Sequence, residues 1–332
     1  NIDFRLRRRD FSADGKRAGT PWLGLKLAEI KDLDAALVVG SFLRKDHPLI
    51  AQRLRQAAKK YTKVSLVTVG GDDPLIKLHA NVVVSPADLP LALGAIVKAA
   101  AQAKGATVPA GLESVDPCEQ SKAIAASLID GEKRAIFLGN VAEQHADAAQ
   151  LQLLAQELAA LTGASFGFLG EAANSVGGYV AGAAGSGLSA YDMLAQPRKA
   201  YVVLGTELDL DSHNGPQALA ALKQAALTVV LTSFKDGAVA DYADALLPIA
   251  PFTETSGTFV NLEGRWQDFQ AVARAPGQVR PGWKVLRVLG NLLGLAGFNH
   301  ETTDEVRAEA LGDVAKLAAR LDNGTSAAIA VA

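Results

Sequence analysis

Three segments of this chain share one pattern that restricts the folds open to it. Each is a short run of apolar and β-branched residues, ends in glycine and a small polar residue, and precedes a stretch with helical spacing. Runs of this kind are typical of buried parallel strands. The three segments are 35–41 (AALVVGS), 135–140 (AIFLGN) and 200–206 (AYVVLGT).

A helix and a further strand are expected after each segment. Repeated leucines and alanines predict helices over 48–60, 146–161 and 217–226. Further apolar runs predict strands at 64–69, 165–169 and 227–234, with short ones at 81–85 and 245–249. Three β-α-β units imply parallel sheets with right-handed crossovers. The predicted fold class is therefore α/β.

Glycine, proline and composition shifts divide the chain into five predicted parts. Glycines and prolines gather between 103 and 121, so a linker is predicted at 111–120. A first α/β region is predicted over 1–110, and residues 120–190 can complete it. The α/β segment 121–190 ends in a glycine-rich loop over 177–190. Residues 191–300 hold the third β-α-β unit. Residues 301–332 hold a helix over 302–320 and an alanine-rich tail after 322, expected to be disordered or packed on a partner.

Composition excludes several classes of protein. A net charge of −2 with 49% hydrophobic residues excludes a disordered chain and gives no positive field for nucleic acid. Cys118 is the only cysteine, and the five histidines are scattered, so neither an iron–sulfur cluster nor a structural zinc site is expected. No apolar run approaches the roughly 18 residues of a membrane span.

The strand ends are the candidate ligand sites. Glycine between a parallel strand and a helix lets the backbone approach a phosphate, and the helix offers free N–H groups. The candidate nucleotide pockets are Gly40-Ser41, Gly139-Asn140 and Gly205-Thr206. Because no complete nucleotide fingerprint is present, the same glycines can serve tight turns alone. No nucleophile motif is present, so no catalytic residue is assigned.

The basic residues near the amino terminus allow two interpretations. Arg5, Arg7, Arg8 and Arg9 can form a phosphate-binding arm, or a solvated or interface segment.

The segment 251–267 (PFTETSGTFVNLEGRWQ) carries the most information. Two glycines bracket a short strand, and Glu254 and Glu263 lie close in sequence to Arg265. The planar guanidinium matches a carboxylate, so a tight loop with a buried or half-buried Arg–carboxylate pair is predicted, and an active-site role stays open. The residues assigned to this structural motif are Glu254, Gly257, Thr258, Asn261, Glu263, Gly264 and Arg265.

These residues resemble a known family. ADYADALLP at 240–248, followed by the pattern ExxGTFxNxEGRxQ, is similar to the motif of the molybdopterin oxidoreductase superfamily. The version TETSGTFVNLEGRWQ at 253–267 most resembles the family of the large iron–sulfur subunit, the G subunit, of bacterial NADH:quinone oxidoreductase (respiratory complex I). Residues 1–11, 38–60 and 137–179 are similar to that family in the same order.

The resemblance implies a fold and a role. It implies two Rossmann-like parallel-sheet domains, like the middle domains of formate dehydrogenase and DMSO reductase-type enzymes. It also implies electron transfer from NADH to a quinone such as ubiquinone, with iron–sulfur clusters ahead of Asn1. The implied partners are other subunits of the peripheral arm of complex I, on the cytoplasmic side of the bacterial inner membrane. Since the first residue is Asn and Met193 is the only methionine, a piece of a longer protein is expected.

Two departures from the family pattern bear on a cofactor. Arg8 or Arg9 stands where the resemblance places a Cys, selenocysteine or Ser ligand of molybdenum, and arginine stays protonated. Phe42 and Glu207 stand in turns that often read GxNP in the cofactor enzymes. We therefore expect a cofactor-free scaffold and subunit-interaction region. One alternative is an active, formate dehydrogenase-like enzyme with bis-molybdopterin guanine dinucleotide, and another is a retained nucleotide or anion pocket at Gly40, Gly139 or Gly205.

Overall fold

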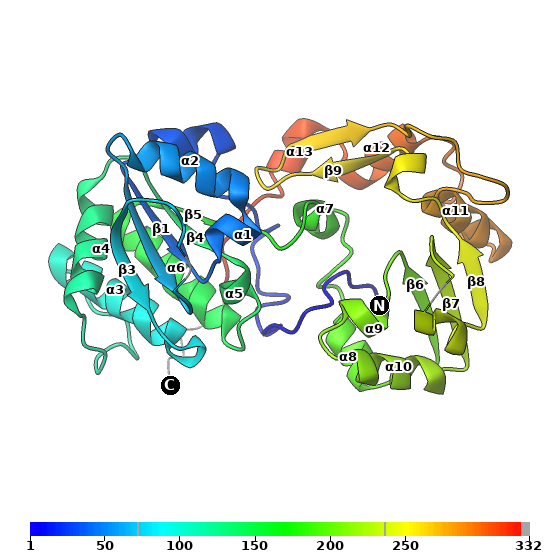
Figure 1. The fold of residues 1–332 in the computed structure, drawn as a ribbon, viewed down its shortest axis with the longest axis horizontal. Coiled ribbons are helices and arrows are strands. Elements are labelled where there is room, and N and C mark those ends of the chain that lie inside the picture. Colours follow the sequence, from blue (N-terminus) through cyan, green and yellow to red (C-terminus); the bar gives the residue numbers. More distant parts are fainter. Residues whose placement is uncertain (72, 236, 327–332) are drawn as a thin grey trace. The chain divides into compact units, whose positions relative to one another are not determined.

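The computed structural model describes residues 1–71, 73–235 and 237–326, which form two compact units (Figure 1). The five-stranded unit contains residues 9–177, 260–265 and those from 318 on. The three-stranded unit contains residues 1–8, 178–259 and 266–317. Each unit has its own parallel sheet, so the predicted α/β class with parallel sheets is confirmed.

The five-stranded unit is built on one parallel sheet with the order β3-β2-β1-β4-β5. All five residues of the central strand β1 are buried, as expected of a strand covered on both faces. Ala35, Leu37 and Val39 face one core, whereas Ala36 and Val38 face the other. The strands are β1 (Ala35–Val39), β2 (Lys63–Thr68), β3 (Leu78–Val83), β4 (Arg134–Leu138) and β5 (Ser165–Phe168).

Helices cover both faces of this sheet (Figure 1). The first core is completed by α3 (Leu89–Lys104), α4 (Glu119–Asp130) and α6 (Ala148–Thr162). The second is completed by the 3₁₀ helix η1 (Leu27–Asp32) and by α2 (Pro48–Ala58). Shorter helices follow individual strands: α1 (Leu43–Asp46), η2 (Pro86–Asp88) and α5 (Asn140–Glu143). Another short helix, α7 (Ser175–Val180), contains the point at which the chain passes from one unit to the other.

Local sequence explains where two of these helices begin. Pro48 occupies the first turn of α2, where its missing N–H costs no hydrogen bond. The thiol of Cys118 caps α4, because its Sγ accepts from the Ser121 N–H at 3.5 Å.

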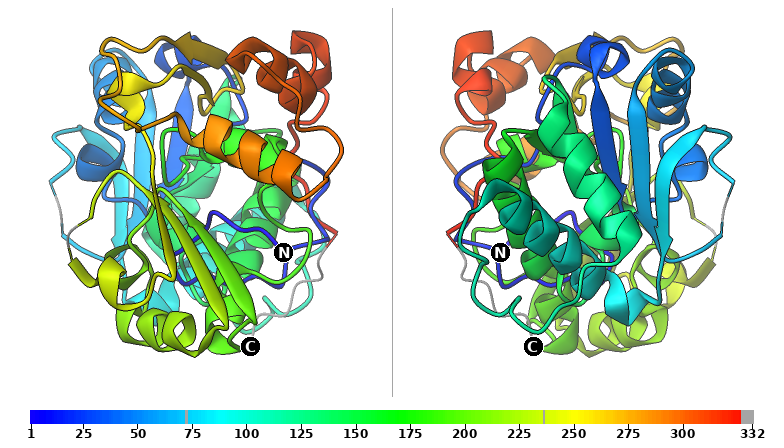
Figure 2. Two further views of the ribbon diagram at one scale, coloured as in Figure 1. Left: turned by 90° about the vertical axis from the view of Figure 1, so that its right-hand side faces the viewer. Right: turned by 90° about the vertical axis from the view of Figure 1, so that its left-hand side faces the viewer.

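The three-stranded unit has a parallel sheet with the order β6-β7-β8 and a separate two-stranded sheet, β9 with β10 (Figure 2). One face of the parallel sheet packs on α8, α9 and α10 through a core that includes Val203, Leu208 and Val230. The strands are β6 (Ala200–Leu204), β7 (Leu227–Thr232), β8 (Ala245–Pro248), β9 (Gly257–Val260) and β10 (Trp266–Phe269). The helices are α8 (Ala190–Ala195), α9 (Leu208–Asp211), α10 (Gly215–Gln224), η3 (Gly237–Asp241), η4 (Phe252–Glu254), α11 (Gly282–Leu292), α12 (Thr303–Leu311) and α13 (Val314–Ala318).

The division between the units differs from the predicted boundaries. The predicted linker at 111–120 lies inside the five-stranded unit, because β4, which follows it, pairs with β1. The chain instead leaves this unit after Gly177, within the predicted glycine-rich loop, where residues 175–180 form α7. Residues 260–265 of the motif segment belong to the five-stranded unit.

The carboxyl-terminal region also differs from its prediction. The helix expected over 302–320 is two helices, since Gly312 has a φ of 71° and ends α12. Part of the tail packs on its own unit: the Asn323 side chain accepts from Trp22 N at 2.8 Å and donates to Phe166 O at 2.6 Å. The prediction for 327–332 lies outside the described residues. Within the described residues, no helix is both long and apolar enough to cross a membrane.

Candidate functional site

The five-stranded sheet changes direction of winding between β1 and β4. From β1 the chain moves outward to β2 and β3, and from β4 it moves the other way to β5. At such a switch point the carboxyl ends of the two strands usually leave a crevice in which α/β proteins bind ligands. The fold places Gly40-Ser41 and Gly139-Asn140 together there, whereas Gly205-Thr206 follows β6 in the other unit.

Backbone groups at this switch point are hydrogen-bonded to each other. The carbonyl oxygen of Gly40 accepts from Val141 N at 2.9 Å and from Ala142 N at 3.3 Å. These N–H groups in the first turn of α5 are ones that a phosphate would otherwise take. A Cβ on Gly139 would lie 2.3 Å from Ser41 Cβ, so the two turns pack directly on each other.

The first and third turns each hold a carboxylate from their own chain. Phe42 N donates to Asp46 Oδ2 at 3.2 Å. In the other unit, Asp211 Oδ2 accepts from Thr206 Oγ1 at 2.7 Å and from Glu207 N at 2.8 Å. Each aspartate thus occupies the position of an anion at the strand end. The sequence reasoning predicted neither contact, although 40–46 (GSFLRKD) and 205–211 (GTELDLD) share the pattern G-[ST]-x-L-x-x-D.

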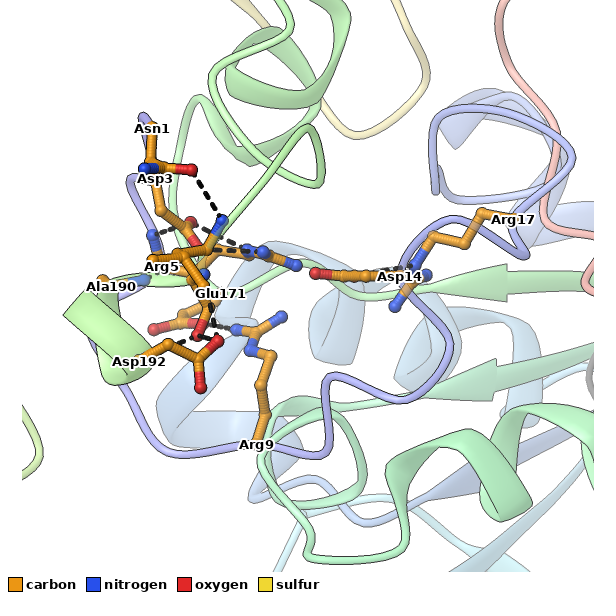
Figure 3. Close-up of polar contacts among 11 residues, drawn as sticks. Asn1, Asp3, Arg5, Arg9, Asp14, Arg17, Glu171, Ala190 and Asp192 are labelled. Atoms are coloured by element: carbon orange, nitrogen blue, oxygen red, sulfur yellow. Dashed lines mark hydrogen bonds and ion pairs between the residues drawn. The ribbon is translucent and has the colours of Figure 1, made fainter. Parts of the chain in front are cut away.

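The amino-terminal arginines divide into buried and exposed pairs. The guanidinium of Arg9 is buried and forms an ion pair with Glu171, and the side chains point toward each other in Figure 3. Arg5 is also buried, and its guanidinium donates two hydrogen bonds of 2.8 Å to the carboxylate of Asp3. Arg7 and Arg8 are exposed. Of the two candidates for the position of the molybdenum ligand, Arg9 is therefore the one held inside its unit.

Glu143 lies beside the Arg9–Glu171 pair. Its Oε1 is inaccessible to solvent and has no hydrogen-bond partner among the described residues. The pKa of this carboxyl is raised to about 7, mainly by burial. The charges of Arg9 and Arg17 lower this pKa, and the charge of Glu171 raises it further. A hydrogen bond from the backbone of Gly170 also lowers this pKa. The residue was not singled out from the sequence, because a glutamate one turn into a short helix gives no signal of burial.

The motif residues within 261–265 of the five-stranded unit form a turn that is hydrogen-bonded to η1. Asn261 Oδ1 accepts from Glu263 N at 3.1 Å and from Arg265 N at 3.0 Å. Glu263 Oε2 accepts from Leu27 N, the first residue of η1, at 2.9 Å. Gly264, with a φ of 78°, packs so closely on Leu321 that a Cβ would lie 2.1 Å from its side chain.

The predicted ion pair in this segment is wrong. Arg265 is exposed, and within the described residues no ion pair joins it to Glu254 or Glu263. The physical reason is that Glu263 turns toward the free N–H of η1, which a carboxylate stabilises at a helix start.

The remaining motif residues lie in the other unit. Thr258 Oγ1 donates to Asp268 Oδ1 at 2.6 Å, and a Cβ on Gly257 would lie 2.7 Å from the ring of Phe269. Glu254 ends the short helix η4.

Replacing Asn261 by Ala should destabilise the five-stranded unit by about 1–2 kcal/mol, because two N–H groups of the turn lose their acceptor. The Nδ2 of Asn261 donates to Glu263 Oε1 at 3.4 Å, so Asn261→Asp, which keeps the acceptor oxygen, is made together with Glu263→Gln to avoid two facing carboxylates and should then recover most of the loss. Urea unfolding of the two variants beside the wild type measures both values. Equal losses in the two variants would contradict the role given to Oδ1.

One known family matches most of the chain. A profile of the family described as "Molybdopterin oxidoreductase" matches residues 3–292. The chain belongs to the molybdopterin oxidoreductase family. The resemblance predicted from the 240–267 region is thereby confirmed.

Several relatives of this family member are named as oxidoreductases or their subunits. It is 28% identical over 173 residues to the G subunit of NADH-quinone oxidoreductase from Shewanella oneidensis, covering 51% of this chain and 19% of that protein. It is 40% identical over 83 residues to the mitochondrial NADH-ubiquinone oxidoreductase 78 kDa subunit of Candida albicans, covering 25% of this chain and 11% of the relative. It is 34% identical over 112 residues to probable oxidoreductase YjgC of Bacillus subtilis, covering 34% of this chain and 11% of that protein. The matched segments thus span less than a fifth of each relative.

Solved structures share the fold. Acetylene hydratase from Pelobacter acetylenicus superimposes with a TM-score of 0.62 at 14% identity, over 92% of this chain and 52% of that one. A formyltransferase/hydrolase complex from Methylorubrum extorquens gives a TM-score of 0.52 at 18% identity, over 81% of this chain and 76% of that one.

The family name implies a molybdopterin cofactor, so the switch point must be tested against it. A phosphate of a dinucleotide cofactor needs hydrogen-bond donors. The backbone donors of Val141 and Ala142 are already used by Gly40 O, whereas the buried Ser41 hydroxyl and the Nε of Arg9 have no hydrogen-bond partner among the described residues. The backbone N–H groups of α5 are therefore not free to bind a phosphate at the β1–β4 switch point. Among the described residues, no three His, Cys, Asp or Glu side chains are grouped around a position for a metal ion.

Proposed function

We propose that this chain is a region of an NADH:quinone oxidoreductase subunit that serves respiratory electron transfer as a cofactor-free scaffold. Family membership and the relatives named as subunits of NADH-quinone and NADH-ubiquinone oxidoreductases support the respiratory part of this proposal. The iron–sulfur clusters, in this proposal, belong to the rest of the subunit.

The closed switch point is the observation that carries the scaffold role. A site for a dinucleotide cofactor keeps backbone donors free at the strand ends. Here Gly40 O takes the donors of α5, and Asp46 and Asp211 take donors of the other two turns. The Arg9–Glu171 pair further occupies the interior with charges that satisfy each other.

The proposed partners are the other subunits of the peripheral arm of the complex, on the cytoplasmic side of the bacterial inner membrane. The relative from Shewanella oneidensis, which is named as a subunit of an NADH-quinone oxidoreductase, supports assembly with other subunits. Buried ion pairs and packed turns suit such a role, because a docking region needs a fixed surface rather than a ligand-dependent one.

Metal and pterin analysis tests the scaffold role. The chain is produced in a bacterium that makes bis-molybdopterin guanine dinucleotide, alongside a molybdopterin enzyme as the positive control. We expect molybdenum and tungsten, measured by mass spectrometry, and oxidised pterin fluorescence to stay far below one equivalent per chain. Stoichiometric metal with pterin would replace this proposal by the formate dehydrogenase-like alternative.

Nucleotide binding tests the remaining alternative. Thermal unfolding is measured with GDP, GTP, ATP and inorganic phosphate, and no saturable rise in Tm is expected. A ligand at about 100 times its Kd would add about 2.7 kcal/mol, which such a measurement detects readily. A saturable shift lost in Gly205→Glu or Gly139→Glu would show a retained pocket and contradict a scaffold without ligands.

A further inference from the structure

Helix α11 has apolar residues on two sides. Its inner side packs on its own unit: a Cβ on Gly282 would lie 3.5 Å from Leu204 and 3.7 Å from Ile249, and Gly290 is buried against Phe298. Its outer side carries Lys284, Val288 and Leu292 at intervals of four residues, which places them in one row.

The exposed apolar residues gather at the carboxyl end of this helix. Val288 is 50% exposed, Leu292 81%, Leu293 66% and Leu295 52%. The chain stays compact here, because Leu293 N donates to Leu289 O and Leu295 N donates to Gly290 O. We call these four residues the α11 patch. Contiguous exposed apolar residues of this kind mark interaction sites.

The charged residues of the segment that carries the α11 patch have one sign. Residues 269–300 contain no Asp or Glu, and their charged residues are Arg274, Arg280, Lys284 and Arg287. Arg274, Arg280 and Lys284 are exposed. An apolar centre with a basic surround complements an apolar surface bordered by carboxylates.

We propose that the α11 patch is the docking surface for a partner subunit that presents apolar side chains bordered by Asp and Glu. This inference rests on the proposed function, which supplies the assembly in which such a subunit occurs. A protein partner is favoured over a lipid surface because the large exposed apolar residues are confined to positions 288–295, at and just after the end of α11, whereas an interfacial helix commits a whole apolar face to the membrane.

Site-specific photo-crosslinking tests the docking surface. The tagged full chain, with p-benzoylphenylalanine in place of Leu292, is produced in the cell that encodes it, and cross-linked peptides are sequenced. Leu49, 72% exposed on α2 of the other unit, is the control position. We expect position 292, and not position 49, to yield a peptide of another protein with apolar residues flanked by acids. A cross-link only to lipid, to a second copy or within the same polypeptide, or no cross-link, overturns the proposal.

Two sets of variants separate this inference from the proposed function. In chains without the photo-reactive residue, Leu292→Asp with Leu293→Asp should lower co-purification of the partner identified by cross-linking at least ten-fold, with unchanged circular dichroism and Tm, whereas Leu49→Asp should not. Lys284→Glu should weaken recovery at low salt and much less at high salt, since a rim charge acts through screened attraction.

Unchanged recovery in both sets overturns the docking surface. Failure of the wild-type chain to co-purify with respiratory subunits instead contradicts the proposed function, even where a cross-link to an acid-bordered apolar peptide supports the patch.

Discussion

Replacing Glu143 by Gln is expected to stabilise the five-stranded unit above pH 7 and to leave it nearly unchanged at pH 4. The pKa of this carboxyl rises from 4.5 to about 7 on folding, with burial as the main cause. The folded unit therefore binds a proton that the unfolded chain releases, so its contribution is fully present below pH 4.5 and is lost as the pH rises through 7. The rise in pKa corresponds to about 3 kcal/mol.

The measurement needs a signal from one unit. Trp22 belongs to the five-stranded unit, and the other two of the three tryptophans, Trp266 and Trp283, belong to the three-stranded one. In a background with Phe at 266 and 283, the fluorescence of Trp22 reports urea unfolding of the five-stranded unit alone. The free energy of unfolding is then followed between pH 4 and pH 9.

Two control variants define the outcome. Glu171→Gln removes a charge that raises the pKa of Glu143, so the loss of stability should move to lower pH. Glu132→Gln changes an exposed side chain and should shift the free energy of unfolding by less than about 0.5 kcal/mol at every pH. If Glu143→Gln and the wild type lose stability in parallel from pH 5 to pH 8, the burial assigned to Glu143 is wrong.

Replacing Gly40 by Ala is expected to cost about 3 kcal/mol or more and to lower the Tm of the five-stranded unit by about 10 °C. Gly40 has a φ of 63°, which an L-residue adopts at a cost of about 1–2 kcal/mol. Its Cβ would also lie 2.6 Å from Ala142 N and 2.8 Å from Ala142 Cβ, so backbone would have to move. Overpacking of this kind adds about 1–3 kcal/mol.

Gly105→Ala is the matched control in the same unit. Gly105 has a φ of 62°, and no atom lies within 4 Å of the position that its Cβ would take, so only the backbone cost applies. The difference between the two variants therefore measures how tightly the turns after β1 and β4 are closed. Equal losses, measured by thermal unfolding, would mean that the switch point can open to admit a ligand.

The local pattern of the chain predicted most of the fold. The runs at 35–41, 135–140 and 200–206 lie at β1, β4 and β6. Burial on both faces explains the apolar runs of β1 and β4, whereas Val202 and Leu204 of β6 are exposed. The family followed from the 240–267 region, whose motif is specific. The chain leaves the five-stranded unit within the glycine-rich segment singled out from the sequence, whereas the predicted linker at 111–120 lies inside that unit, since a glycine- and proline-rich loop marks a change of direction equally well inside a unit and between units.

The sequence predicted where the candidate site lies, but not whether its turns are open to a ligand or closed by protein contacts. Glycine at a strand end fits both a phosphate and a closed turn, and only the contacts of Gly40 O and Gly139 distinguish them. The aspartates of the first and third turns had a readable signal in their shared spacing from Gly40 and Gly205. The side chain of Glu263, by contrast, accepts from η1, which lies more than 200 residues earlier in the chain, so its partner could not be read from the local sequence.

The amino-acid sequence determined by itself the α/β class, the family and the places where strands end, because these depend on neighbours along the chain. The tertiary structure decided that the turns after β1 and β4 close on each other, that Arg9 rather than Arg8 is buried, and that Glu143 is held where ionisation is costly. The reason is physical: burial and hydrogen-bond partners come from segments far apart in sequence, and they exist only once the sheet has brought those segments together.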